Sequence, residues 1–289
     1  MAKNRRILVL GGTGFIGSAI VCALADDRSC RVSAIHHEPL RDTKPSEALY
    51  YHLDAATSPE ALRSLLVGHD TLVILTQPNE RVIKNVLSVI PKGVRILYAS
   101  SVLVYKEDAT PRKEDASLHA VSDYERGKLA EEELLRSFAE KSGANPATIM
   151  RFGSVYGGPK NQGIVSLFLR ALQSGEPVTI AGDGTHVRDF IHIDDVVAAM
   201  RALIGREQKE PLETVNIATG TGTTLIETIA LLSAVAGRPV PHIFGPTVME
   251  KRAVVADNAK MRAMTGWRPN IRLKEGLSRA LNRSRRSPL

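Results

Sequence analysis

A tyrosine and a lysine four positions apart are the residues of this 289-residue chain whose types and spacing most clearly point to chemistry. Tyr124 is part of Ser122-Asp-Tyr-Glu125, a capping-box pattern that predicts a helix beginning at Ser122, and Lys128 follows in the same predicted helix. Residues four apart share one face of a helix, so the phenol and the ammonium would be neighbours. A free phenol has a pKa of about 10, and a nearby ammonium favours its ionised form. The pair therefore predicts a general acid–base group.

A serine hydroxyl is expected beside this pair. The segment Ile96-Leu-Tyr-Ala99 predicts a strand that ends at Ser100 and Ser101. A hydroxyl at that strand end could hydrogen-bond the reacting oxygen, and we favour Ser101, with Ser100 as the alternative. Both serines could also simply cap the strand end, and a Tyr-x-x-x-Lys spacing arises often by chance. The chemical interpretation therefore depends on a reaction partner bound elsewhere in the chain.

The N-terminal segment Ile7-Leu-Val-Leu-Gly-Gly-Thr-Gly-Phe-Ile-Gly17 predicts a site for that partner, because it has the pattern of a buried strand, a tight turn and a helix start. Gly12, Gly14 and Gly17 fit G-x-G-x-x-G, and the glycines at 11, 14 and 17 are also spaced by three. A side chain here would block the turn or keep the backbone away from a pyrophosphate at the helix N-terminus. The pattern predicts a dinucleotide site, with contacts from Gly11, Gly14, Phe15, Ile16 and Gly17.

The end of the second predicted strand bears on the choice between NAD and NADP. An acidic residue about 20 positions after the glycines usually binds the adenosine ribose hydroxyl. This chain has His36 and His37 there instead, with Glu38 and Arg41 just beyond. Without a carboxylate to repel it, a 2′-phosphate could bind His36 or Arg41, so NADP is slightly favoured over NAD. Exposed loop histidines without a cofactor role are an almost equal alternative.

Two further residues complete the expected cofactor site. Asp54 follows the strand-like Tyr50–Leu53 and stands where related dinucleotide sites place an acid against adenine. Its alternative role is to cap the helix that follows. Thr76, just after the fourth predicted strand, is the remaining expected cofactor contact. No metal site is expected.

Short aliphatic runs alternate with helical patterns through the first half of the chain. The predicted strands are Ile7–Leu10, Arg31–Ile35, Thr71–Leu75, Arg95–Ala99 and Ala147–Arg151. The predicted helices are Ser18–Ala25, Pro59–Leu66, Glu80–Ile90 and Asp123–Lys141. This alternation predicts an α/β fold, a Rossmann-type doubly wound parallel sheet, with a smaller C-terminal α/β substrate lobe. We expect the dinucleotide-binding domain over 1–153 and about 185–220, and the substrate lobe over about 154–184 and 221–289.

Composition narrows the class of protein. The net charge is +7, but lysine and arginine are scattered among acids, and the dense cluster Arg279–Arg286 is predicted to be a solvated C-terminal tail rather than a nucleic-acid site. The two cysteines, Cys22 and Cys30, are predicted to stay reduced. No run approaches the roughly 18 apolar residues of a membrane helix, so we expect a soluble, cytoplasmic protein.

Five segments occur in a recognisable order: Gly11–Gly17, Ser100–Tyr105, Tyr124–Lys128, Arg151–Gly157 and Arg188–Asp195. In these motifs the chain resembles the extended short-chain dehydrogenase/reductase family over nearly its whole length, in particular the nucleotide-sugar epimerases, dehydratases and reductases. The resemblance implies that Tyr124 is the catalytic base, that Lys128 holds the nicotinamide ribose and lowers the tyrosine pKa, and that Ser101 is the family's Ser/Thr. It also implies a homodimer through a helix pair that includes the Tyr124 helix.

The resemblance implies substrate contacts in the second half of the chain, where several positions depart from the family pattern. Arg188 matches an arginine that contacts the substrate diphosphate, which suits its planar, bidentate donors. Ser154 stands in place of the family's asparagine. A second phosphate-binding arginine is replaced by Thr247, which leaves Arg252 or Lys251 as substitutes.

Two departures concern the reaction itself. After the fourth strand the family has His-x-Ala-Ala and a longer connection, whereas this chain has Leu75-Thr-Gln-Pro78, so we expect an unusually shaped or open nicotinamide side. Dehydratases carry Asp-Glu after the catalytic Ser/Thr, and this chain has Val102-Leu103, which argues against elimination of water.

Three functions therefore stand as alternatives at this stage. The first is reversible oxidation and reduction at C4 of a nucleotide-diphosphate sugar, as in an NDP-sugar 4-epimerase. The second is an NADPH-dependent reductase of an NDP-4-keto-6-deoxyhexose, which the missing acid at His36 favours. The third is a catalytically silent NAD(P)-binding sensor. The ratio of cofactor consumed to substrate converted separates the first two.

Overall fold

The computed structural model describes residues 4–37, 47–247 and 251–286. The chain divides into two compact units. Unit 1 comprises the residues up to Ser101, Asp123–Arg151 and Met200–Val215, and unit 2 comprises Val102–Ser122, Phe152–Ala199 and the residues from Asn216 onward.

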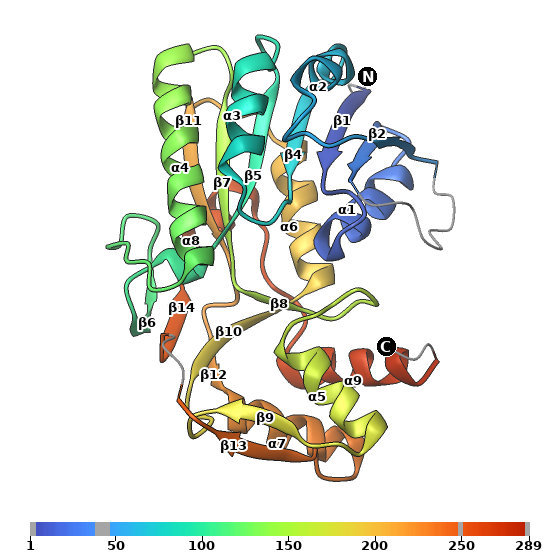
Figure 1. Ribbon diagram of the computed structural model, residues 1–289, viewed down its shortest axis with the longest axis vertical. Helices are drawn as coiled ribbons and strands as arrows, with labels where there is room; N and C mark the ends of the chain where they lie inside the picture. Colours follow the sequence, from blue (N-terminus) through green and yellow to red (C-terminus); the bar gives the residue numbers. More distant parts are fainter. Residues whose placement is uncertain (1–3, 38–46, 248–250, 287–289) are drawn as a thin grey trace. The chain divides into compact units, whose positions relative to one another are not determined.

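Unit 1 is built on a seven-stranded sheet with the order β11-β7-β5-β4-β1-β2-β3 (Figure 1). Its strands are β1 (Arg5–Leu10), β2 (Cys30–His36), β3 (Leu49–His52), β4 (Thr71–Ile74), β5 (Arg95–Ser101), β7 (Ala147–Phe152) and β11 (Leu212–Ile217). Strand β1 pairs in parallel with β2 and β4, β2 with β3, and β4 with β5. Continuous apolar runs such as Ile7–Leu10 are buried, as expected for strands covered on both faces. The predicted Rossmann-type parallel sheet is confirmed.

The strand order reverses at β1, between β4 and β2. Strands β2 and β3 lie on one side of β1, and β4, β5, β7 and β11 lie on the other. In open α/β sheets, ligands bind at the carboxyl ends of the strands where the order reverses. The glycine turn follows β1 and the Leu75–Pro78 segment follows β4, so both segments lie at this place.

Helices cover the sheet; the first four in chain order lie where the sequence pattern predicts them, and the last was not predicted. They are α1 (Phe15–Ala25), α2 (Pro59–Leu66), α3 (Glu80–Val89), α4 (Asp123–Ser142) and α6 (Ile193–Gly205), the last of which is shared with unit 2. Helices α2, α3 and α4 bury apolar residues in one core cluster with β1, β4 and β5. Helix α1 starts at Phe15 rather than at Ser18, because its N-cap is Gly14, so that Gly17 already lies within the helix.

Unit 2 has a five-stranded sheet with the path β12-β10-β14-β6, to which β8 adds by pairing with β10. Its strands are β6 (Asp108–Arg112), β8 (Ser154–Tyr156), β10 (Val187–His192), β12 (Gly222–Thr224) and β14 (Ala253–Ala256), and β9 (Val178–Ala181) pairs with β13 (His242–Gly245) separately. The helical elements are η1 (Val102–Val104), α5 (Ile164–Ser174), α7 (Leu225–Ala236), α8 (Ala259–Thr265) and α9 (Leu273–Arg286). Helices α5, α7 and α9 share a core with Tyr156 and Phe190.

The basic C-terminal cluster is not the loose tail that the sequence suggested. Arg279–Arg286 lies on helix α9, and Leu277 and Leu281 of this helix are buried in the unit 2 core. Arg279 pairs with Glu275 at 2.6 Å and with Asp194 at 3.4 Å. Arg279, Arg283 and Arg285 are exposed, but the segment that carries them is a packed amphipathic helix.

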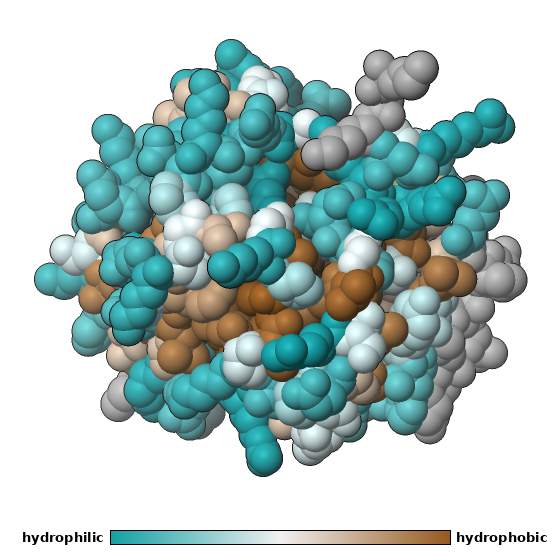
Figure 2. Space-filling view, turned by 90° about the horizontal axis from the view of Figure 1, so that it is seen from above, coloured by the Kyte–Doolittle hydropathy of each residue, from teal (hydrophilic) through white to brown (hydrophobic). Residues whose placement is uncertain are grey.

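Figure 2 shows, on the face seen from above, an apolar area near the middle with polar residues around it. Cys22 and Cys30 are both free thiols, as predicted. Among the residues that the structure describes, no helix is long and apolar enough to span a membrane.

Candidate active site

The glycine turn has the geometry of a phosphate cradle. Gly11 has φ +83°, in the left-handed region, and a Cβ there would lie 2.9 Å from the carbonyl oxygen of Leu75. A Cβ on Gly17 would lie 2.0 Å from the Gly11 carbonyl oxygen. Helix α1 has no side-chain cap and no acidic residue in its first turn. Its first backbone N–H groups and its positive dipole end are therefore available to an anion.

Of the two histidines at the end of β2, His36 is buried and only His37 is exposed as the alternative interpretation expected. His36 is the last residue of β2 and is only 6% exposed. Its ring centroid lies 5.3 Å from that of His52, whose Nε2 is 2.7 Å from the carbonyl oxygen of His37. His37 is exposed, and Arg41 lies outside the described residues. The end of β2 thus carries His36, packed against His52 of β3, where an acidic residue was expected.

Asp54 stabilises its own turn rather than the start of α2. Its Oδ1 accepts a hydrogen bond from the backbone N–H of Ala56 at 2.8 Å, which holds the pKa of its carboxyl below the usual value. The N-cap of α2 is Ser58, and Pro59 occupies the first helical position. Helix capping is therefore not the role of Asp54 in this structure.

Ser101, Tyr124 and Lys128 come from two elements of unit 1. Ser101 ends β5, and Tyr124 and Lys128 lie one turn apart at the start of α4. A hydrogen bond joins the side chains of Ser101 and Tyr124. Burial raises the pKa of Tyr124, the Ser101 hydrogen bond lowers it, and the carboxylates of Glu131 and Glu125 raise it. Because Tyr124 is still 37% exposed, solvent weakens the effect of burial.

Ser100 has a different environment from Ser101. Its hydroxyl donates to Glu132 at 2.5 Å, and Glu132 also receives two hydrogen bonds from Arg151, of 3.0 Å and 2.6 Å. All three side chains are at least 97% buried. This arrangement is a structural ion pair, which leaves Ser101 as the serine that contacts the tyrosine.

The Lys128 ammonium is held by backbone oxygens and a carboxylate. It donates to the carbonyl oxygens of Ala99 at 2.8 Å and Thr76 at 3.0 Å, and it lies 3.6 Å from Glu131 Oε2. It also sits 4.8 Å from the centre of the Tyr98 ring. Burial lowers the pKa of Lys128, whereas Glu131 raises it. The expected lowering of the Tyr124 pKa by Lys128 is thus opposed by a carboxylate that the sequence interpretation did not include.

The short segment after β4 is in close contact with helix α4. Helix α4 approaches it where Gly127 has no side chain, since a Cβ there would lie 2.6 Å from Pro78 Cβ. Thr76 Oγ1 is buried and has no hydrogen-bond partner among the described residues. An unpaired buried hydroxyl beside a glycine cradle is what a cofactor-binding site would present.

The candidate substrate residues lie in unit 2. Arg188 Nη1 donates to the carbonyl oxygens of Val187 at 3.0 Å and Lys251 at 2.9 Å. Lys251 is 2% exposed and its ammonium donates to the carbonyl oxygens of Leu103 and His119. Lys251 therefore anchors the chain segment before α4, and Arg252, which is exposed, remains the candidate substitute.

Ser154 opens β8, the short strand that pairs with β10. In the pairing of β8 with β10, Ser154 lies opposite Phe190, two residues beyond Arg188. Ser154 is half-buried, so its hydroxyl is compatible with a polar substrate contact.

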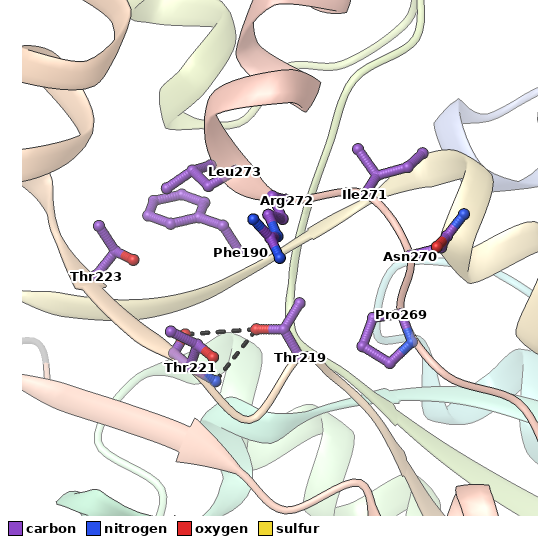
Figure 3. A pocket seen from close by; sticks show the side chains of 9 residues that line it. All are labelled: Phe190, Thr219, Thr221, Thr223, Pro269, Asn270, Ile271, Arg272 and Leu273. Atoms are coloured by element: carbon purple, nitrogen blue, oxygen red, sulfur yellow. Dashed lines mark hydrogen bonds between the residues drawn. The ribbon is translucent and has the colours of Figure 1, made fainter.

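Unit 2 also contains a cavity of about 470 Å³ that sequence reasoning missed (Figure 3). Its lining consists of Phe190, Thr219, Thr221, Thr223 and Pro269–Leu273. The Thr219 hydroxyl donates to Asp189 and accepts from the Thr221 N–H at 3.2 Å, so part of this polar lining is already satisfied. None of the three predicted substrate residues lines it.

A model of the NAD dependent epimerase/dehydratase family matches residues 7–218. The chain belongs to this family. The predicted family is thereby confirmed, together with the enzyme class of nicotinamide-dependent epimerases and reductases.

Individual relatives agree over almost the full chain. A dTDP-L-rhamnose 4-epimerase of Burkholderia thailandensis is 26% identical, covering 96% of this chain and 94% of the relative. A dTDP-4-dehydro-6-deoxyglucose reductase of Escherichia coli is 24% identical, covering 97% and 98%. Among solved structures, MoeE5 in complex with UDP-glucuronic acid and NAD superposes with a TM-score of 0.88 at 29% identity, covering 98% and 99%. The UDP-glucose 4-epimerase of Thermotoga maritima with UDP-glucose gives 0.84 at 26% identity, with the same coverage.

Proposed function

We propose that this chain is an NAD(P)-dependent NDP-sugar 4-epimerase in which Tyr124 moves the proton of the sugar C4 hydroxyl. The observation that carries the proposal is the hydrogen bond between Ser101 and Tyr124, beside a buried lysine and in the same unit as the glycine turn. The 4-epimerases among the relatives and solved structures support it.

The residues present fit a dinucleotide. The glycine turn has space that a Cβ would fill, the first turn of α1 carries no acidic residue, and Thr76 offers a buried hydroxyl without a hydrogen-bond partner among the described residues. MoeE5 was crystallised with NAD. A nicotinamide bound there would supply reversible hydride transfer with the sugar carbon.

The protein contributes proton transfer and orientation. Tyr124 removes the hydroxyl proton as the carbon is oxidised and returns it when the carbon is reduced. Ser101, hydrogen-bonded to Tyr124, fixes the phenol and can hydrogen-bond the same sugar oxygen. Lys128 can hold a ribose only by exchanging a carbonyl partner, because its donors already engage Thr76, Ala99 and Glu131.

We assign the cofactor to unit 1 and the sugar nucleotide to unit 2. Unit 1 contains every described residue of the expected cofactor site, including Asp54, for which we propose the adenine contact. Unit 2 contains Ser154, Arg188 and Arg252, which we assign to the substrate diphosphate. Two arginines suit this role because guanidinium binds phosphate oxygens bidentately.

We also propose a slight preference for NADP over NAD. The support is the replacement of the ribose-binding acid by the packed His36 at the end of β2. In His36→Asp the new carboxylate would repel a 2′-phosphate and accept a ribose hydroxyl, so the ratio of NADP to NAD affinity should fall at least tenfold, about 1.4 kcal/mol. Calorimetric titration with both cofactors measures this ratio. An unchanged ratio would show that His36 does not select the cofactor.

A homodimer working in the cytoplasm completes the proposal. The support for the dimer is the family resemblance of α4, and that for the location is the pair of free thiols, Cys22 and Cys30, which suit a reducing compartment. Sedimentation equilibrium gives the mass in solution, and twice the 31.4 kDa chain mass is expected.

The alternative is a one-way NADPH-dependent reductase of an NDP-4-keto-6-deoxyhexose. The reductase among the relatives and the histidine at position 36 favour it. Cofactor stoichiometry decides: an epimerase turns over without net oxidation of NADPH, whereas a reductase consumes one NADPH for each sugar. A protein that binds NADP but converts no member of a broad NDP-sugar panel would instead be a silent sensor.

Tyr124→Phe tests the proposed acid–base role. The variant keeps the ring but loses the proton-transfer group, so turnover should fall about 10²- to 10⁴-fold. Cofactor affinity should be retained, since the glycine turn is unchanged. Tyr51→Phe, a substitution in β3 of unit 1, serves as the matched control and should stay near wild-type. Near-normal turnover of Tyr124→Phe would remove this tyrosine from the mechanism.

A further inference from the structure

A buried carboxylate lies one helical turn after Lys128. Glu131 is 0% exposed, and its Oε2 is 3.6 Å from the Lys128 ammonium. The same oxygen accepts a hydrogen bond from the Tyr98 hydroxyl, and Oε1 accepts one of 2.6 Å from the backbone N–H of Asn79. An isolated charge at this depth would be strongly destabilising, so these three partners are needed to keep the carboxylate in place.

Glu131 connects the lysine to the unusual short segment after β4. Asn79 ends that segment and caps α3, where its Oδ1 accepts from the N–H groups of Arg81 and Val82. At the other end of the segment, the Thr76 carbonyl oxygen accepts from Lys128. The Lys128–Glu131 pair thus binds both ends of the Thr76–Asn79 segment. Glu131 fixes the lysine and this segment in one arrangement.

The carboxylates of α4 are compensated in different ways. Glu132 is paired within unit 1 by Arg151, which lies 2.6 Å away. Glu125 is a second buried carboxylate that acts on Tyr124. Glu131 is the one whose cationic partner is Lys128, so the pair carries no net charge.

The other elements around Tyr124 bring few charges to it. Strand β5 contributes Ser101 and the phenol of Tyr98, whose pKa is raised by burial and by Glu131. The charged residues at the start of α3, Glu80, Arg81 and Lys84, are exposed, and Lys84 pairs with Glu80 at 2.8 Å. Tyr124 is therefore influenced by a neutralised lysine rather than by a free ammonium.

We propose that Glu131 is a positioning residue that holds Lys128 and the Thr76–Asn79 segment and sets the pH range in which Tyr124 works, an inference that rests on the acid–base function proposed for Tyr124. Removing only the negative charge would leave the Lys128 ammonium uncompensated and favour the phenolate. Activity that depends on the phenolate would then persist to lower pH. This shift of the pH profile distinguishes the variant from one with a damaged site, which would lose activity at every pH.

The test is a titration of Tyr124 itself, followed by ¹³C NMR of ring-labelled tyrosine, with Tyr124→Phe used to assign the signal. In Glu131→Gln the midpoint should move down by about one pH unit, a tenfold larger phenolate fraction at a given pH. Glu131→Asp keeps the charge and should titrate close to wild-type. Glu133→Gln removes an exposed carboxylate of the same helix and should leave both titration and turnover unchanged.

A charge-balance cycle covers the case in which Glu131→Gln does not fold. Lys128→Gln leaves Glu131 uncompensated and should move the Tyr124 midpoint up, whereas the double variant with Glu131→Gln is neutral and should return it toward wild-type. An unshifted midpoint in Glu131→Gln, or the same midpoint in Lys128→Gln and the double variant, would overturn the proposal. Because the titration needs no substrate, failure of the acid–base function would be seen separately, as normal turnover in Tyr124→Phe.

Discussion

Replacing Gly17 by alanine should disrupt cofactor binding more than it unfolds the protein. The added Cβ would lie 2.0 Å from the Gly11 carbonyl oxygen, whereas ordinary van der Waals contact begins at 3.4 Å. Helix α1 cannot move away easily, because Ile20, Val21 and Leu24 on its inner face are at least 99% buried. The turn must therefore distort, and forced overpacking of this kind costs about 1–3 kcal/mol.

The distortion falls on the backbone that would cradle the pyrophosphate. A loss of at least tenfold in cofactor affinity, about 1.4 kcal/mol, is the expected minimum. Urea unfolding measures the stability change, and isothermal titration with NADP and NAD measures the affinity. Gly205→Ala is the matched control, because its Cβ would meet nothing within 4 Å. Wild-type affinity and an unchanged unfolding midpoint in Gly17→Ala would refute the reasoning.

Two further predictions concern stability. Arg151→Met leaves the buried Glu132 without its cation and should lower the free energy of unfolding in urea by about 3–5 kcal/mol. The double variant with Glu132→Leu should recover most of this loss. An equal loss in the double variant would contradict the prediction. Burial lowers the pKa of His192 below 6.5, so the unfolded chain gains a proton before the folded one, and stability should fall as the pH drops below about 6.5. His192→Gln should flatten this part of the profile of unfolding midpoint against pH, and a profile as steep as wild-type would exclude His192 as its cause.

The fold could be predicted where local patterns agree with packing. Pro59–Leu66 forms a helix with the predicted bounds, since proline favours the first helical position and the segment buries Leu62 and Leu66. The β1 run and the glycine turn together specified the sheet and its first crossover. The C-terminal cluster was misjudged because its charge outweighed the helical spacing of Leu277 and Leu281 in the interpretation.

The site could be predicted only as far as chemistry follows sequence spacing. Tyr124 and Lys128 are one turn apart on a single helix, so their proximity follows from the sequence. The contacts that determine their electrostatics do not, because Tyr98 and Ala99 belong to β5 and reach α4 through tertiary packing. Glu132, the middle of three consecutive glutamates, pairs with Arg151, and only the structure shows that Glu131 instead joins the lysine.

Single-turnover reduction of bound cofactor is the measurement that tests the central claim most directly. Wild-type protein loaded with NAD or NADP and mixed with an accepted NDP-sugar should show reduced nicotinamide absorbance. Tyr124→Phe should show it about 10²- to 10⁴-fold more slowly with cofactor affinity retained. Reduction at the wild-type rate in Tyr124→Phe would contradict the assignment of proton transfer to Tyr124.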